Sequence, residues 1–171
     1  MKTIIFTIFA VLMFGSAAVA QNRSIYTSTR AEACRTIESN PDEGGSYEGE
    51  CRGVGGYKLR LMEGDLRQAL DVITPGKKRF ELIKWGMFGG FSVVGDKVEW
   101  RMKRGVPVAL ISRYSVADGD DSTKSKSYLI VSKIGAKSSC VTDIVDPMTK
   151  QNEKARELAD AAAGKPCKIT E

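Results

Sequence analysis

FSVVGDKVEWRMKRGVPVALISRYSV, residues 91–116, is the stretch that decides the fold. In its first half, apolar and charged side chains alternate in the order Val98, Glu99, Trp100, Arg101, Met102 and Lys103. A period of two residues is typical of a β-strand with one face on a core and the other face in water. The alternation resumes after Gly105, so the stretch predicts a β-hairpin.

The register of this hairpin depends on its loop, because a slip of one residue turns every side chain to the opposite face. A three-residue loop, 103–105, with Gly105 in the left-handed conformation, places apolar side chains on one shared face. The pairs would be Met102 with Val106, Trp100 with Val108, and Val98 with Leu110. A two-residue loop would instead set charged Glu99 opposite apolar Leu110. We therefore expect the three-residue loop.

The first twenty residues, MKTIIFTIFAVLMFGSAAVA, have the three parts of a secretory signal peptide. Lys2 precedes an apolar run over 4–14, and the small-residue pattern Ala18-Val19-Ala20 follows it. Because the run is shorter than a membrane-spanning helix requires, a retained anchor is the less favoured alternative. We expect residues 1–20 to be removed and residues 21–171 to form a single β-rich domain.

The charge of the chain favours anionic partners, although only mildly. Removing the first twenty residues, which carry one Lys and no acid, lowers the net charge from +5 to +4. The positive residues are scattered along the sequence rather than gathered in one run, which disfavours nucleic acid as the partner. We expect a partner in the cell envelope or outside the cell, such as an acidic protein, a polysaccharide or a lipid head group.

The four cysteines predict two disulfides, since an even number in an exported chain is typical of oxidised pairs. Of the three possible connectivities we favour Cys34 with Cys51 and Cys140 with Cys167, because each pair closes a modest loop. A metal site is disfavoured, since no pair has CxxC spacing and the chain contains no histidine. The expected location is the periplasm or the extracellular space.

The remaining patterns predict further strands joined by turns. The segments are 24–28 and 34–38, which could instead hold a short helical turn over 29–35, then 46–52, 57–61, 66–74, 80–85, 127–134 and 138–145. Segment 66–74 also fits helical spacing, and we interpret it as a strand from its β-rich context. We predict a mainly β fold, an antiparallel sheet arranged as a sandwich or partly closed barrel, with one C-terminal helix packed on it.

The C-terminal helix has clear start and stop signals. Asp146 is a good N-cap, Pro147 would occupy the first helical position, and Gly164 would close the far end. One narrow face would consist of Met148, Ala155, Leu158, Ala159 and Ala162. Small alanines would let this face lie close against a sheet, so the helix is predicted to be a packing element.

Three loops have features that can serve in binding, and each also has a purely structural interpretation. The glycine-rich segment 53–56 is interpreted as a turn, because no helix follows it as a phosphate loop requires. In the aromatic loop 86–91, Phe88 could be presented to a ligand, but we expect Phe88 and Phe91 to be tucked into the core. The polar connection 117–126 has a DxD pattern, yet it lacks the later ligands of a calcium loop and is predicted to be a solvated turn.

The absence of histidine excludes Ser-His-Asp and Cys-His catalysis within this chain. A small hydrolase that uses a carboxylate pair is the alternative function, with Glu48 and Glu50, or Glu63 and Asp65, at strand spacing. The favoured function is an exported, non-catalytic binding or structural domain with an anionic ligand and no cofactor. The predicted ligand-binding residues are Arg101, Lys103, Arg104, Lys58, Arg60 and Phe88.

Overall fold

The structure is a computed structural model that describes residues 22–42, 45–121 and 123–168. The predicted signal peptide, residues 1–20, lies outside the described residues. Within these ranges the elements are β1 (Arg23–Ser28), η1 (Ala31–Ala33), β2 (Cys34–Asn40), β3 (Ser46–Arg52), β4 (Lys58–Gly64), β5 (Arg67–Ile73), β6 (Arg79–Ile83), β7 (Ser92–Lys103), β8 (Val106–Ala117), β9 (Ser125–Lys133), β10 (Cys140–Val145), α1 (Gln151–Asp160) and η2 (Ala162–Gly164). The strands predicted over 24–28, 34–38 and 66–74 are confirmed by β1, β2 and β5.

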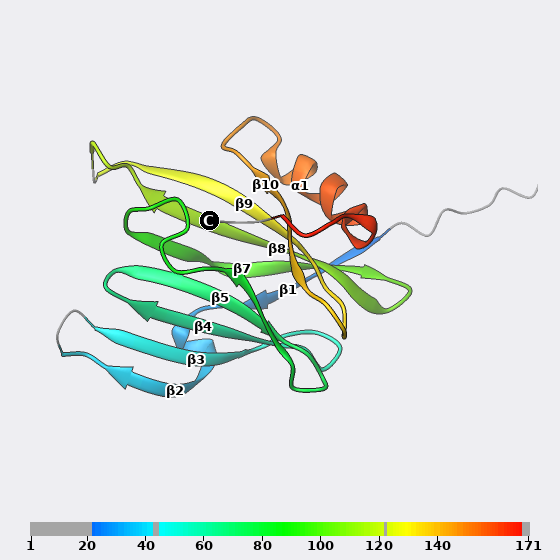
Figure 1. Cartoon of the computed structure of the whole chain (residues 1–171), viewed down its shortest axis with the longest axis horizontal. Helices are drawn as coiled ribbons and strands as arrows, with labels where there is room; N and C mark the ends of the chain where they lie inside the picture. Colours follow the sequence, from blue (N-terminus) through cyan, green and yellow to red (C-terminus); the bar gives the residue numbers. More distant parts are fainter. Residues whose placement is uncertain (1–21, 43–44, 122, 169–171) are drawn as a thin grey trace, which may run out of the picture.

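The ten strands form one mostly antiparallel sheet that is not closed (Figure 1). Its main path runs β10-β9-β8-β7-β5-β4-β3-β2, while β1 pairs with β7 and β6 pairs with β5. Strands β2 to β5 form the first half of this path, and strands β7 to β10 form the second half. The two halves meet at a single parallel pair between β5 and β7, Arg67 with Ser92. The predicted mainly β fold with an antiparallel sheet and one C-terminal helix is confirmed.

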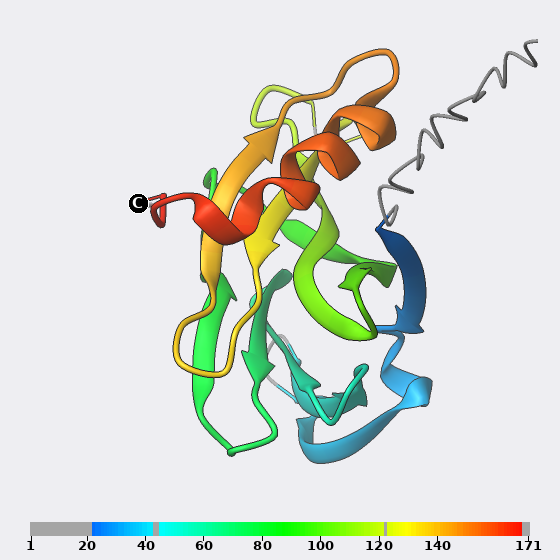
Figure 2. The ribbon, with the colours of Figure 1, turned by 90° about the vertical axis from the view of Figure 1, so that its right-hand side faces the viewer.

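The sheet is bent, and the helix lies against one part of it (Figure 2). Buried side chains form two cores. The larger core draws fully buried side chains from both halves of the sheet, including Leu59 and Leu70 from the first half and Trp100, Leu110 and Ile130 from the second. A smaller core lies between α1 and strands β8 to β10. Strands β7 to β9 therefore bury side chains on both faces, because one face meets the first half of the sheet and the other meets the helix.

The predicted register of the β7–β8 hairpin is wrong. The turn has two residues, Arg104 and Gly105, and Lys103 pairs with Val106. A β-bulge between Arg101 and Met102 then inserts one extra residue on β8, so Trp100 lies opposite Leu110 instead of Val108. The bulge restores the pairing of apolar side chains that a two-residue turn alone would have lost. Trp100 is completely buried, and its indole N–H donates to Thr27 Oγ1 at 2.8 Å.

The helix begins later than Asp146 and Pro147 suggested. Its first residue is Gln151, and the preceding Lys150 is left-handed, with φ 62°. The side-chain amide of Gln151 donates to the backbone carbonyls of Ser127, Val145 and Asp146, at 2.7–3.1 Å, so the side chain fixes the path of the connection. The predicted packing face of the helix is observed for its alanines but not for Met148. Its alanines, Ala155, Ala159 and Ala162, are buried, whereas Met148 precedes the helix and is 57% exposed.

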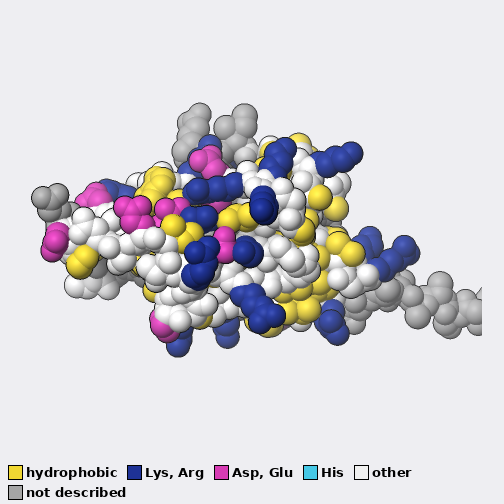
Figure 3. All heavy atoms as spheres, turned by 90° about the horizontal axis from the view of Figure 1, so that it is seen from below, with side chains coloured by type: hydrophobic (Ala, Val, Ile, Leu, Met, Phe, Trp, Pro, Cys, Tyr) yellow, Lys and Arg dark blue, Asp and Glu magenta, His cyan; other side chains and the backbone are white. Residues whose placement is uncertain are grey.

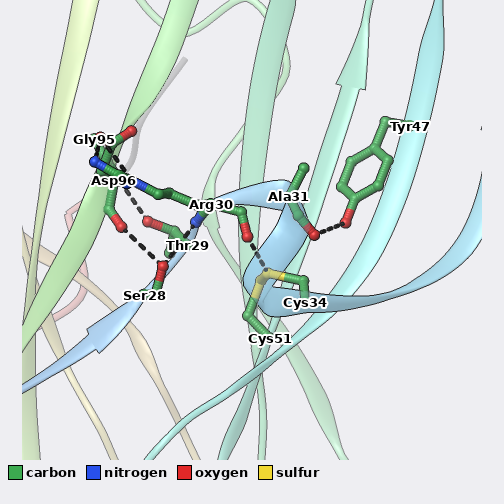
Figure 4. The surroundings of a disulfide bond; sticks show 9 residues. All are labelled: Ser28, Thr29, Arg30, Ala31, Cys34, Tyr47, Cys51, Gly95 and Asp96. Atoms are coloured by element: carbon green, nitrogen blue, oxygen red, sulfur yellow. Dashed lines mark hydrogen bonds and ion pairs between the residues drawn. A yellow bond between two sulfur atoms is a disulfide. The ribbon is translucent and has the colours of Figure 1, made fainter.

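Both predicted disulfides are confirmed. Cys34–Cys51 joins the start of β2 to the end of β3, and Cys140–Cys167 joins β10 to the segment that follows the helix. Beside the first bridge, Thr29 donates to the carbonyl of Gly95, and the tyrosine hydroxyl of Tyr47 donates to the carbonyl of Ala31 at 3.1 Å (Figure 4). Two disulfides indicate an oxidising compartment outside the cytoplasm. In the described part of the chain, no helix has the length and apolar character needed to cross a membrane.

Candidate functional site

Four turns lie beside one another at one end of the sheet, towards the right of Figure 1. They are β3–β4, β5–β6, β7–β8 and β9–β10. A Cβ built on Gly55 would lie 3.2 Å from Pro107, and one on Gly56 would lie 3.3 Å from Pro75, so the β3–β4 turn sits between two others. The ammonium of Lys78 donates to the carbonyl of Lys137 at 3.3 Å, which links the β5–β6 and β9–β10 turns.

These turns concentrate positive charge. We define the basic end as residues 52–58, 73–79, 103–106 and 133–139, which contain Lys and Arg but no Asp or Glu. Six of its cations are exposed and have no carboxylate within 4.0 Å among the described residues: Arg52, Lys77, Lys78, Lys103, Arg104 and Lys137. Figure 3 shows one face of the molecule, where Lys and Arg predominate towards the right and carboxylates gather towards the left.

Two of these cations occupy backbone conformations that their side chains disfavour. Arg104 has φ 51° and Lys77 has φ 64°, both in the left-handed region where Gly and Asn are more stable. A non-glycine residue there costs on the order of 1 kcal/mol. The turns therefore hold positive side chains at positions where a neutral Asn or Gly would stabilise the fold.

A groove of about 490 Å³ opens beside the β3–β4 turn, and its charged lining residues are Arg35, Glu50, Arg52 and Lys58. Glu50 is its one carboxylate among the described residues, and it accepts from Lys58 at 2.7 Å and from Arg35 at 3.3 Å. The hydrogen bond from Lys58 is the main cause that lowers the pKa of Glu50; burial opposes it and Arg35 adds to it. The groove keeps a positive surplus, because three cations face one carboxylate.

The structure brings some of the predicted ligand-binding residues together and separates others. Lys103, Arg104 and Lys58 lie at the basic end. Arg60 lies further along β4, where it pairs with Glu48 at 2.8 Å. Whether these residues bind a ligand stays a prediction.

The expectation that Arg101 faces water is wrong. It is 6% exposed and lies beneath α1, where its guanidinium makes two 2.8 Å hydrogen bonds with Asp160. Beside it, Glu99 accepts from Arg156 at 2.8 Å. Burial raises the pKa of Glu99, but hydrogen bonds from Arg156, Ser24 and Tyr26 outweigh it and hold the pKa below its usual value. The charged face of β7 therefore meets the helix instead of solvent.

The aromatic loop lies at the opposite end of the sheet from the basic end (Figure 1). The expectation that Phe88 and Phe91 are buried is wrong, since they are 43% and 47% exposed. Met87 takes the core position instead and is buried. The ring of Phe88 stacks on Tyr128 with centroids 4.3 Å apart, so one face of the ring is covered. Apart from Met87, the residues of the loop are exposed.

The carboxylates that the hydrolase alternative named are engaged with other side chains. Besides the Glu50 contacts, Glu48 pairs with Arg60, Asp65 pairs with Arg67, and Glu63 accepts from Gln68 at 2.6 Å. Across residues 22–42, 45–121 and 123–168, no three His, Cys, Asp or Glu side chains are placed to hold a metal ion.

The sequence prediction missed Arg52, Lys77, Lys78 and Lys137. A signal was present, because each lies beside a Gly-marked turn, and alternate turns of an antiparallel sheet fall at the same end. The fold and its charged end define a disulfide-bonded β domain with a helix on one face. Comparison with protein-family models, with curated proteins and with solved structures finds no match.

Proposed function

We propose that this protein is an exported, non-catalytic domain that binds an anionic polysaccharide through its basic end. One observation carries the proposal: six exposed Lys and Arg side chains, from four neighbouring turns, have no carboxylate partner among the described residues. Unmatched charges on one surface repel one another, and a polyanion that binds them relieves this repulsion. The predicted signal peptide and the two disulfides support a location where such polymers occur.

The shape and composition of the basic end favour a hydrophilic chain over a membrane. The groove beside the β3–β4 turn has room for a chain segment, and its wall includes glycine backbone as well as Arg52 and Lys58. Proteins that insert into lipid surfaces use exposed aromatic or large apolar side chains. Among the described residues, Val106 is the one large apolar side chain that is strongly exposed at this end.

The test is binding of a fluorescein-labelled oligogalacturonate, measured by fluorescence anisotropy at low and raised salt. The variant Lys77→Asn/Lys78→Gln/Lys103→Gln/Arg104→Asn removes four charges, and Asn suits the left-handed positions. An exposed ion pair contributes up to about 1 kcal/mol, so four contacts of about 0.7 kcal/mol each predict a loss of about 100-fold at low salt. The matched control, Lys124→Gln/Lys126→Gln/Lys150→Gln/Lys154→Gln, removes the same net charge elsewhere and should weaken binding less than threefold.

Two outcomes would overturn the proposal. An equal loss in both variants would mean that net charge, and no particular surface, governs binding. Vesicles of phosphatidylglycerol, or poly-glutamate, bound more tightly than the oligogalacturonate by the unaltered protein would identify a lipid or an acidic protein as the partner class. Binding of the oligogalacturonate that falls with salt, and that only the basic-end variant loses, supports the proposal.

A further inference from the structure

A second cavity lies on the face of the sheet that α1 covers, between α1 and strands β1, β7, β8 and β9. It has a volume of about 420 Å³, and its lining residues are Tyr26, Gly95, Asp96, Lys97, Glu99, Ile111, Arg113, Leu129, Asn152 and Arg156. We name it the helix groove. Sites for small organic molecules have volumes of about 300–1,000 Å³, so this cavity is large enough to hold one.

An irregularity of β7 opens the helix groove. The register between β7 and β8 shifts between Val94 and Val98, so residues 95–97 lie opposite Arg113 alone. Bulges of this kind are common beside functional sites, where they re-aim a side chain. Glycine allows a close approach of the two strands at this point, because a Cβ built on Gly95 would lie only 3.0 Å from the Cβ of Arg113.

Arg113 is held in place by neutral groups, and no carboxylate of the described residues lies within 4.0 Å of it. It donates to Ser127 Oγ at 2.7 Å, to Gln151 Oε1 at 3.2 Å and to Asn152 Oδ1 at 3.2 Å, all of them neutral oxygens. A guanidinium carries five N–H groups in a fixed planar fork, which suits a carboxylate or phosphate. The hydrogen bonds therefore fix the orientation of the guanidinium and leave its charge unmatched.

The two carboxylates that line the helix groove form ion pairs with arginines other than Arg113. Glu99 is paired with Arg156 at 2.8 Å, and Asp96 is paired with Arg30 at 2.9 Å. Lys97 has no carboxylate within 4.0 Å in the described part of the chain, and its ammonium lies 5.8 Å from the centre of the Tyr26 ring. Arg113 and Lys97 thus give the groove a positive surplus.

The lining of the groove also contains an apolar part. Ile111 and Leu129 are 5% and 3% exposed, and the ring of Tyr26 stands beside them at the surface. We propose that the helix groove binds a small organic anion, whose phosphate or carboxylate group pairs with Arg113 and Lys97 while its apolar body packs on Ile111 and Leu129. This site is separate from the basic end and does not depend on the polysaccharide proposal.

The test is a two-dimensional amide NMR titration of the mature, oxidised protein with n-hexyl phosphate, inorganic phosphate and hexanol as probes. Hexyl phosphate should bind at least tenfold more tightly than inorganic phosphate or hexanol, because only it satisfies both parts of the groove. Its shifts should centre on residues 95–97, 111–113 and 152. Arg113→Gln should weaken binding at least tenfold, and Lys97→Gln about threefold. The second variant keeps the test decisive if the first fails to fold.

The basic-end variant described above is the control, because it should leave hexyl phosphate binding within twofold. Three results would overturn the inference. They are equal affinity for hexyl phosphate and inorganic phosphate, unchanged affinity in both the Arg113→Gln and Lys97→Gln variants, or shifts confined to the basic end. Failure of the helix groove in this way would leave the polysaccharide proposal intact, since the two sites share no residue.

Discussion

The two ends of the sheet differ in charge, covalent bracing and surface chemistry. The basic end holds four short turns, and both disulfides join strand ends beside it, at Cys51 and Cys140. The opposite end carries Asp42, Asp65, Asp118, Asp120 and Asp121 in its connections. Its exposed apolar side chains are Leu66, Trp85, Phe88, Phe91 and Val93. We call it the acidic end.

The difference shows that the topology of a sheet can place charges that are scattered along the sequence at one of its two ends. Successive connections of an antiparallel sheet alternate between its two ends. In this chain the β2–β3, β4–β5 and β8–β9 connections carry aspartates, whereas the β6–β7 connection carries Lys84 and no acid. The basic-end residues at and beside the β3–β4, β5–β6, β7–β8 and β9–β10 turns include Lys and Arg but no acid. Apart from β6–β7, the sign of the charge therefore alternates between successive connections, and the two signs are separated between the two ends of the sheet.

The largest expected effect is a loss of stability when a disulfide beside the basic end is removed. Cys34 and Cys51 are 17 residues apart, so the variant Cys34→Ala/Cys51→Ala should lose about 3 kcal/mol of the free energy of unfolding. Cys140 and Cys167 are 27 residues apart, and opening that bridge should cost slightly more. Urea unfolding monitored by Trp fluorescence gives both values. A loss below 1 kcal/mol in either variant would show that the bridge does not brace this end.

A matched pair of turn substitutions separates stability from binding. Arg104 at the basic end and Leu66 at the acidic end both have positive φ, 51° and 57°. Arg104→Asn and Leu66→Asn should each stabilise the fold by about 1 kcal/mol, because Asn tolerates the left-handed region. Thermal unfolding measures this gain.

The two substitutions should differ in the oligogalacturonate assay. Arg104→Asn removes one contact of about 0.7 kcal/mol and should weaken binding about threefold, whereas Leu66→Asn should leave it unchanged. Equal affinities in the two variants would contradict the assignment of Arg104 to the binding surface. A loss of stability in both would contradict the cost assigned to the left-handed turns.

Much of the fold was predictable because its signals are local. Alternation identified the strands, turn residues separated them, and cysteine spacing favoured the pairing that is observed. The β7–β8 register was not predictable in this way, since both loops considered assumed a regular ladder and the observed hairpin combines a two-residue turn with a bulge. Trp100, opposite Leu110 after the bulge, lies in a core that also contains residues of the first half of the sheet, and such long-range packing is not visible in local alternation.

The candidate sites were harder to predict, because they depend on how distant segments meet. Alternation placed Arg101 on a polar face, but it could not show that α1 covers that face. One signal was available, since Arg156 and Asp160 are four residues apart on the helix and match the charges of Glu99 and Arg101. The basic end required the topology as well, because its cations come from four separate turns.

The smallest effect that still distinguishes the two ends concerns two carboxylates: Glu50, in the groove beside the basic end, and Asp121, at the acidic end. The pKa values of Glu50 and Asp121 are both lowered, the first mainly by the hydrogen bond from Lys58 and the second mainly by the hydrogen bond from the Thr123 side chain. A lowered pKa means that the carboxylate stabilises the fold above its unfolded pKa, and that this stability is lost as the pH falls through the folded pKa. Both contributions should therefore be present at neutral pH and disappear in acid.

Removing the charge should destabilise the fold by different amounts at the two carboxylates, because their surroundings differ. Glu50→Gln leaves Lys58 and Arg35 facing one another without an anion, so it should cost about 0.5 kcal/mol at pH 7, and the cost should shrink as salt is added. Asp121→Asn removes one of several neighbouring negative charges and should destabilise the fold less. Urea unfolding at pH 7 and pH 3 measures both, and the difference between each variant and the unaltered protein should be smaller at pH 3 than at pH 7, because the carboxylates lose their charge as the pH falls through their folded pKa values.

The same Glu50→Gln variant should bind the oligogalacturonate more tightly, by about twofold, because the groove beside the β3–β4 turn gains net positive charge. Stability and affinity would then change in opposite directions at the basic end. Asp121→Asn should change affinity little, since it lies at the far end of the sheet and is screened from the groove at moderate salt. An equal gain in affinity from both variants would mean that the separation of charge between the two ends has no bearing on binding.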